Sequence, residues 1–345
     1  MTRSLARSAA GLALAAVATA TTIAIAAWAP RPSAAAPPFP RSVAVLRPAR
    51  AAAELDPASR AALARLPFDT AIVASLDLAA ARRTQAGQHL LSALERARAV
   101  QKVAAELRAR VGFDVQRDLA RLWVALPSGA FAGADRSVLV AELTIDQARF
   151  LDWLRRRIGN GFAERRAGQL VYYVANDAAL AFVDQTHMLI TQSSYIEEAL
   201  RVASGARHSA AANRPLVTVA AAAARPDAHA WFAVLVSDGV RADLRQGALT
   251  ASLSDVQWTT AALTFDSVTR WQGDVRTSKS ASATALAPVL RQMIEVAARS
   301  EAVAAAGLAD AIGKTRVAAD RETVHLEGSL PRAQASAALK AVLEP

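Results

Sequence analysis

Cysteine is absent from this chain of 345 residues, and only four of its 40 basic residues are lysine. The lack of cysteine excludes disulfide bonds, thiolate metal ligands, a cysteine nucleophile and a lipidated cysteine that could hold the protein on a membrane. Stability must therefore come from an ordinary apolar core. The hydrophobic share of 53% supplies enough apolar surface for two domains of ordinary size.

Recognisable catalytic motifs are also missing. The chain has neither a Gly-x-Ser-x-Gly elbow nor a Ser-x-x-Lys pair, so a serine hydrolase is not indicated. The segment from Gly307 to Thr315 resembles a phosphate-binding loop, but five residues separate Gly307 from Gly313 where that loop needs four. It also runs from a predicted helix into a predicted strand, whereas a phosphate site needs the opposite order. We interpret it as a helix stop and expect no cofactor.

Histidine and acidic side chains give no assigned catalytic or metal site. The five histidines never have a spacing that would place two ligands on one helix face. We expect His325 to point to solvent, because its strand neighbours Val324 and Leu326 point inward. Asp114 and Asp118 could pair as acid and base, but a helix cap at Asp114 and a solvated Asp118 explain them more simply. A catalytic triad assembled from distant residues stays open.

Residues 1–36 have the order of a secretory leader. Two arginines precede 23 uncharged residues from Ser8 to Pro30, and a Pro- and Ala-rich stretch follows. Small residues at Ser33-Ala34-Ala35 favour cleavage after Ala35, which would give a periplasmic or secreted protein. The alternative is a retained N-terminal membrane anchor, since about 20 residues cross a bilayer. In either case we expect residues 37–345 outside the cytoplasm.

The net charge of +10 is concentrated near the N-terminus. Residues 1–65 have eight arginines and two acidic residues, whereas residues 66–345 have 32 basic and 28 acidic residues. Because the later part is nearly balanced, the charge does not indicate a nucleic-acid-binding domain. Residues 37–67 contain six prolines and scattered arginines. We interpret them as an extended linker with room for a short helix after Asp56.

Residues 68–213 are predicted to form a first α+β unit. Apolar runs predict strands at residues 70–78, 119–127, 137–143, 169–175 and 179–191. Helical periodicity predicts a helix at residues 84–110. Capping boxes at Thr144–Gln147 and Ser194–Glu197 predict the starts of two more helices.

Residues 214–345 are predicted to form a second unit with much the same element order. Strands are expected at residues 230–237, 256–265, 271–277, 315–319 and 323–330, and helical segments at 240–246, 284–306 and 332–343. Residues 215–224 would be the connector between the units. The shared order predicts an α+β fold of two similar tandem units, with mostly antiparallel sheets and helices packed on one face.

Several segments carry a resemblance to a known family. These are Gly112-Phe-Asp-Val-Gln-Arg-Asp-Leu119, the strand Leu170-Val-Tyr-Tyr173, the hairpin at Asp184 and the helix from Tyr195 to Gly205. Together they resemble a family of uncharacterised bacterial envelope proteins, over roughly residues 66–345. The resemblance implies export and repeated α+β units, and it implies no catalytic residues.

A run of arginines is the candidate binding patch. It comprises Arg155, Arg156 and Arg157, with Arg165 and Arg166 close behind. An anionic glycan or lipid would suit this charge. The run also lies in the last turn of a predicted helix, where positive charge suits the negative end of the helix dipole.

We therefore expect a non-enzymatic envelope protein that binds or scaffolds a partner through a sheet face or the cleft between its halves. The candidate partners are an envelope polymer, a lipid surface or another envelope protein, and nucleic acid is not expected. The alternative is a hydrolase that acts on an envelope polymer in the same cleft. A deep pocket with a carboxylate, a histidine and a serine would favour the enzyme, and a shallow apolar or basic groove would favour binding.

Overall fold

The computed structural model describes residues 54–96, 98–127, 136–236, 255–305 and 307–331. The predicted leader at 1–36, most of the predicted linker, the helical turn at 240–246 and the C-terminal helix at 332–343 lie outside the described residues. Within the described residues, no helix is long and apolar enough to cross a membrane.

The strands are β1 (Thr70–Asp77), β2 (Leu119–Pro127), β3 (Val138–Leu143), β4 (Phe162–Ala167), β5 (Leu170–Ala175), β6 (Ala178–Phe182), β7 (His187–Gln192), β8 (Ala230–Leu235), β9 (Val256–Phe265), β10 (Val268–Thr277), β11 (Arg316–Asp320) and β12 (Thr323–Pro331). The α-helices are α2 (Pro57–Leu63), α3 (Leu78–Ala81), α4 (Gln85–Arg96), α5 (Arg98–Val111), α6 (Val115–Asp118), α7 (Gln147–Ile158), α8 (Ile196–Ala203), α9 (Arg214–Ala223), α12 (Ser280–Ala298), α13 (Glu301–Ala305) and α14 (Ala309–Gly313). Two short 3-10 helices are η2 (Gly159–Gly161) and η3 (Ala210–Ala212).

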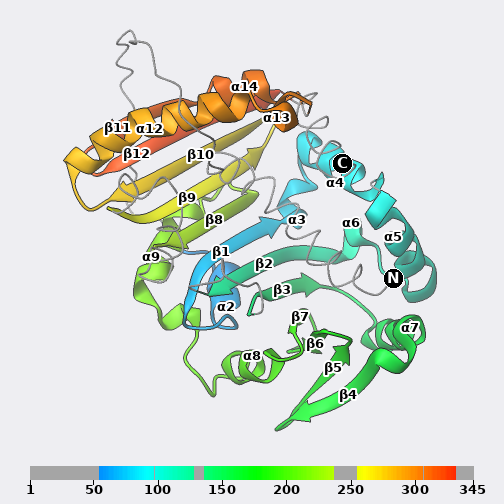
Figure 1. Cartoon of the computed structure of the whole chain (residues 1–345). Helices are drawn as coiled ribbons and strands as arrows, with labels where there is room; N and C mark the ends of the chain where they lie inside the picture. The colour runs from blue at the N-terminus through cyan, green and yellow to red at the C-terminus, as the bar shows by residue number, and fades with distance from the viewer. Residues whose placement is uncertain (1–53, 97, 128–135, 237–254, 306, 332–345) are drawn as a thin grey trace.

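All the described strands join in one sheet. Its 12 strands have the order β11-β12-β10-β9-β8-β1-β2-β3-β7-β6-β5-β4, and Figure 1 follows this order from the orange and red strands to green β4. Each neighbouring pair is antiparallel, including β1 with β8, where Ser75 lies opposite Trp231. The expected α+β class with antiparallel strands is confirmed, and the sheet is continuous between the two halves.

The strand order repeats on either side of the β1–β8 pair. Moving outward, the first half has β1, β2, β3 and β7, and the second has β8, β9, β10 and β12. A helix precedes the first strand of each half, α2 before β1 and α9 before β8. Asp56 caps α2 and Asn213 caps α9, and a proline lies in the first turn of each helix. The β4–β5 hairpin has no counterpart among the described strands of the second half.

Helices lie on both faces of the sheet, whereas the sequence leads us to expect one covered face. In β3, Val138 and Val140 pack into a cluster with residues of α2, α8 and α9. Leu139 and Ala141 alternate with them and pack into a cluster with residues of α5 and α7. Both faces of β3 are apolar, so both need a cover.

The second half has a core of its own on the face that α5 and α7 cover in the first half. There Leu286 and Leu290 of α12 cluster with Val317 of β11 and Val324 of β12. Val234 of β8 packs against the same cluster. Three tryptophans, Trp123, Trp153 and Trp231, are buried.

Some predicted elements differ from those observed. The strand expected at 179–191 is two strands, β6 and β7, and the helix expected at 84–110 is α4 followed by α5. The sequence does not predict β4, because four of its six residues are exposed and no apolar alternation marks it.

The two predicted capping boxes do not cap their helices. Asp146 is the N-cap of α7, and Tyr195 occupies the N-cap position of α8 without a side-chain cap.

The packed part of the chain starts earlier than predicted, and the predicted connector is part of the core. Leu63 and Leu66 are fully buried, whereas the sequence predicts a linker that reaches Pro67. The connector expected at 215–224 is instead helix α9, in which Leu216 and Val219 are buried. The alanine-rich sequence of α9 has few large apolar side chains, so its helical periodicity is weak. The helix is stabilised by the burial of these few side chains in the core.

Candidate functional site

Each half of the sheet has a cluster of an arginine, an aspartate and a histidine. The arginines and the histidines lie at equivalent places in the repeated element order, and the aspartates come from different elements. Arg65, which follows α2, pairs with Asp184, and Asp184 contacts His187 of β7. In the second half, the corresponding cluster consists of Arg225 after α9, His325 of β12 and an aspartate of β10. Each cluster joins the end of a helix to the outer strands of its own half.

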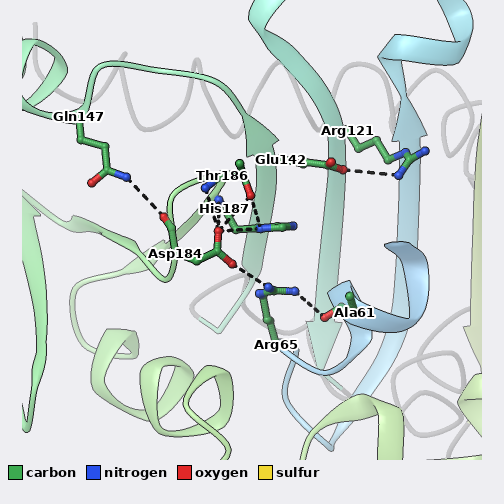
Figure 2. Close-up of polar contacts among 8 residues, drawn as sticks. All are labelled: Ala61, Arg65, Arg121, Glu142, Gln147, Asp184, Thr186 and His187. Carbon is green, nitrogen blue, oxygen red and sulfur yellow. Dashed lines mark hydrogen bonds and ion pairs between the residues drawn. The ribbon is translucent and has the colours of Figure 1, made fainter. Parts of the chain in front are cut away.

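The first cluster is centred on Asp184, as Figure 2 shows. Its Oδ1 accepts hydrogen bonds from the backbone N–H groups of Thr186 and His187, both at 2.8 Å, and lies 2.9 Å from Nδ1 of His187. Its Oδ2 accepts a 2.8 Å hydrogen bond from Arg65. Burial alone would raise the pKa of Asp184, but these hydrogen bonds outweigh it and hold the pKa well below its usual range. The carboxylate therefore closes the β6–β7 turn and ties it to α2.

A row of charged side chains continues from this cluster across the sheet. Glu142 of β3 lies opposite His187 in the strand register, and Arg121 of β2 lies opposite Glu142. Arg121 donates a 2.8 Å hydrogen bond to Asp77 of β1. On its other side, Nη1 of Arg121 lies 3.5 Å from Oε2 of Glu142, as Figure 2 shows. Burial would lower the pKa of Arg121, but Asp77 and Glu142 raise it. These charges compensate one another, which is the arrangement of a structural network.

The second cluster is half-buried. Nδ1 of His325 lies 2.7 Å from Oδ1 of Asp274, and Arg225 lies 3.6 Å from Oδ2. The hydrogen bond to Asp274 raises the pKa of His325, and burial opposes this shift. The sequence predicts that His325 points away from Val324 and Leu326, as it does. It is not simply solvated, however, because its side chain is only 22% exposed and is bonded to Asp274.

The side-chain contacts of the two histidines are with acidic and hydroxyl groups. Nδ1 of His187 lies 3.0 Å from the hydroxyl of Thr186 as well as near Asp184, and Nδ1 of His325 contacts Asp274. Among the described residues, no group of three or more histidine, aspartate or glutamate side chains could hold a metal ion. Asp114 caps α6 as predicted, with a 2.9 Å hydrogen bond from the N–H of Gln116. Asp118 differs from the prediction, since its side chain is 12% exposed and pairs with Arg117.

The five predicted arginines do not converge on one point. Arg155 lies over the ring of Phe162, Arg156 pairs with Asp152 of its own helix, and Arg157 pairs with Glu106 of α5. The other two members of the run, Arg165 and Arg166, are neighbours on β4, so the strand alternation sends them to opposite faces of the sheet.

The structure adds helix α5 to this basic region. Helices α5 and α7 contact each other, and α7 contacts β4 (Figure 1). These three elements contain ten basic and three acidic residues, whereas the other described residues contain 20 basic and 23 acidic residues. We define the basic surface by seven exposed side chains: Lys102, Arg108, Arg110, Arg149, Arg155, Arg156 and Arg166. Arg165 is also exposed, but it is left out because it points to the opposite face of β4 from Arg166. Sequence reasoning finds only the α7 and β4 members, because tertiary packing alone brings α5 beside them.

No family model and no curated protein matches the chain. Crystal form III of TP0453 matches with 7% identity and a TM-score of 0.46, over 81% of this chain and 97% of that chain. Form IV matches with 7% identity and a TM-score of 0.45, and form I with 8% identity and a TM-score of 0.42; each match covers 81% of this chain and 96% of that chain. Likeness at this level carries no argument about function.

Proposed function

We propose that the protein is an exported, non-enzymatic binding protein of the bacterial envelope and that the basic surface contacts an anionic partner. The predicted leader and the resemblance to envelope proteins support the location. The uneven charge distribution supports the site, because three adjoining elements carry an excess of seven positive charges while the other described residues carry a small negative excess. Arginine suits such a role, since its guanidinium can bind phosphate or carboxylate through two hydrogen bonds.

Binding at this surface should depend on individual basic residues and on salt. Arg110→Glu, Arg155→Glu and Arg166→Glu, combined in one basic-surface variant, reverse three exposed charges on α5, α7 and β4. Each basic side chain near an anionic surface contributes about 1 kcal/mol, so the variant should bind at least roughly tenfold more weakly. Salt should weaken wild-type binding because it screens exposed charges.

A control variant distinguishes the effect of charge at the basic surface from the effect of the net charge of the whole protein. Arg214→Glu, Arg299→Glu and Arg316→Glu reverse three exposed charges on the second half, so the net charge changes equally. Sedimentation with an isolated envelope fraction measures the binding of each protein. We expect the wild type and the control variant to sediment and the basic-surface variant to stay in solution. Equal sedimentation of the two variants would contradict the proposed function.

A further inference from the structure

We propose that the anionic partner is a phospholipid bilayer and that the basic surface rests on it by charge, without inserting apolar side chains. This inference depends on the proposed function and specifies the partner. It follows from two features of α5, α7 and β4: their apolar side chains are packed inside the protein, and basic side chains are exposed on their surface.

The apolar side chains of α5 and α7 are used inside the protein. Trp153 of α7 and Val111 of α5 are buried in one cluster, and Leu107, Leu151 and Leu154 pack against it. A helix that inserts into a membrane interface needs a free apolar face. Among the described residues the exposed large hydrophobic side chains are Phe68 and Val296, and neither lies on α5, α7 or β4.

The seven side chains of the basic surface, in contrast, are exposed, and contacts of the half-buried Arg157 hold their elements together. Arg157 joins α7 to α5 through Glu106, and its guanidinium lies 5.6 Å from the ring of Trp153. Arg155 lies 5.4 Å from the ring of Phe162, which stacks on Tyr173 at 5.7 Å. The positive charge is therefore spread over two contacting helices and a strand.

The dimensions of these elements suit an extended surface better than a single polymer strand. Helices of 14 and 12 residues are about 21 and 18 Å long at 1.5 Å per residue. Lipid phosphates in an anionic leaflet present charge over such an area, and clustered basic residues bind it without a groove. A leader that brings the chain to the membrane would place this surface close to its partner.

Vesicles of stated composition test the inference with the full chain. Vesicles of 30% phosphatidylglycerol in phosphatidylcholine are compared with vesicles of phosphatidylcholine alone. Apolar binding by the leader is common to both vesicles, and the positive charge of residues 1–65 is common to the wild type and both variants. We expect the wild type and the control variant to bind the anionic vesicles at least about tenfold more tightly than the basic-surface variant does. This difference should disappear at about 1 M salt, where the screening length is about 3 Å.

A soluble polyanion separates the failure of this inference from failure of the proposed function. Polygalacturonate presents carboxylates on a flexible chain without a bilayer. If polygalacturonate binding depends on the basic surface and vesicle binding does not, the bilayer is the wrong partner and the proposed function survives. If the basic-surface and control variants behave alike with both probes, both proposals fail. Vesicle leakage caused by the wild type would contradict attachment by charge alone.

Discussion

Asp184 and Asp274 each hold an arginine and a histidine, one cluster in each half of the sheet. Both clusters connect the segment after a helix to the outer strands, so they contribute to folding stability. Sequence reasoning misses them as clusters, because the arginine lies 119 residues from Asp184 in one case, and His325 lies 51 residues from Asp274 in the other. Only the strand register brings these residues together.

The contribution of His325 to stability should depend on pH. Its pKa in the folded protein is raised above the ordinary value of about 6.5, through the hydrogen bond to Asp274, with a further contribution from Asp320 and opposition from Arg225. Its stabilising effect is therefore complete below about pH 6.5 and is lost as pH rises through the folded pKa. Urea unfolding from pH 6 to pH 9 should show a smaller loss of unfolding free energy for His325→Gln than for the wild type.

The exposed His208 provides a control for this measurement. His208→Gln should keep the wild-type pH dependence, because no ion pair involves that histidine among the described residues. Identical pH profiles for His325→Gln and the wild type would show that the bond to Asp274 does not stabilise the fold.

Asp184→Asn should destabilise the protein by about 1–3 kcal/mol at pH 7, because the carboxylate accepts two backbone hydrogen bonds and pairs with Arg65. Its pKa is lowered in the folded state, so its stabilising effect is present above the unfolded pKa of about 3.9 and is lost as pH falls through the folded pKa. Urea unfolding at pH 7 and pH 3 should therefore show a smaller difference in unfolding free energy between variant and wild type at pH 3.

Asp266→Asn is the control for this measurement, because Asp266 forms an exposed pair with Arg270. It should change the unfolding free energy by less than about 1 kcal/mol.

At the scale of elements, the β10–β12 pair depends on a glycine. Gly328 lies directly opposite Trp271, and a Cβ atom at 328 would overlap the indole ring. Gly328→Ala should therefore lower the unfolding free energy by about 1–3 kcal/mol, through displacement of the ring. Combining it with Trp271→Leu, which vacates the space, should recover part of the loss. Purely additive effects of the two substitutions in urea unfolding would contradict this account.

The hydrophobic periodicity of the sequence predicts most helices and strands correctly. It fails for an element at the sheet edge and for a helix whose formation depends on tertiary burial. The strands at β1, β2, β3 and β9 have apolar runs that identify them from sequence alone, and β10 is identified by the alternation of its residues with polar ones. Strand β4 lies at the sheet edge and carries charged residues, which is common for edge strands and conceals them from a hydrophobic pattern. Helix α9 lies between prolines in an alanine-rich segment, so its helical character becomes evident only from the burial of Leu216 and Val219.

At the scale of the whole molecule, one cluster joins the two halves. It contains Val73 and Trp123 from the first half and Leu216 and Trp231 from the second. The element order is predictable from sequence, but the merging of the halves into one sheet is not, because it depends on pairing between β1 and β8. The same limit applies to the basic surface, whose α5 members lie far along the chain from its α7 members.

The shared cluster predicts that the halves unfold together. Trp231→Ala should remove a buried side chain from the second half and lower the unfolding free energy by about 3–5 kcal/mol. Amide exchange should increase in β3 of the first half as well as in β9 of the second. Increased exchange confined to the second half would show that the halves are independent domains.

The contact between the basic surface and an anionic bilayer can be located directly, because the chain has no cysteine and single cysteines can be introduced for labelling. Ala109→Cys on α5 and Ala148→Cys on α7 replace exposed residues among the basic side chains, and Ala319→Cys on β11 replaces an exposed residue at the opposite edge of the sheet. The measurement is the rate at which a water-soluble maleimide modifies each thiol, with and without phosphatidylglycerol vesicles. The account predicts slower modification at positions 109 and 148 and an unchanged rate at position 319. Unchanged rates at all three positions, or protection at position 319 alone, would contradict it.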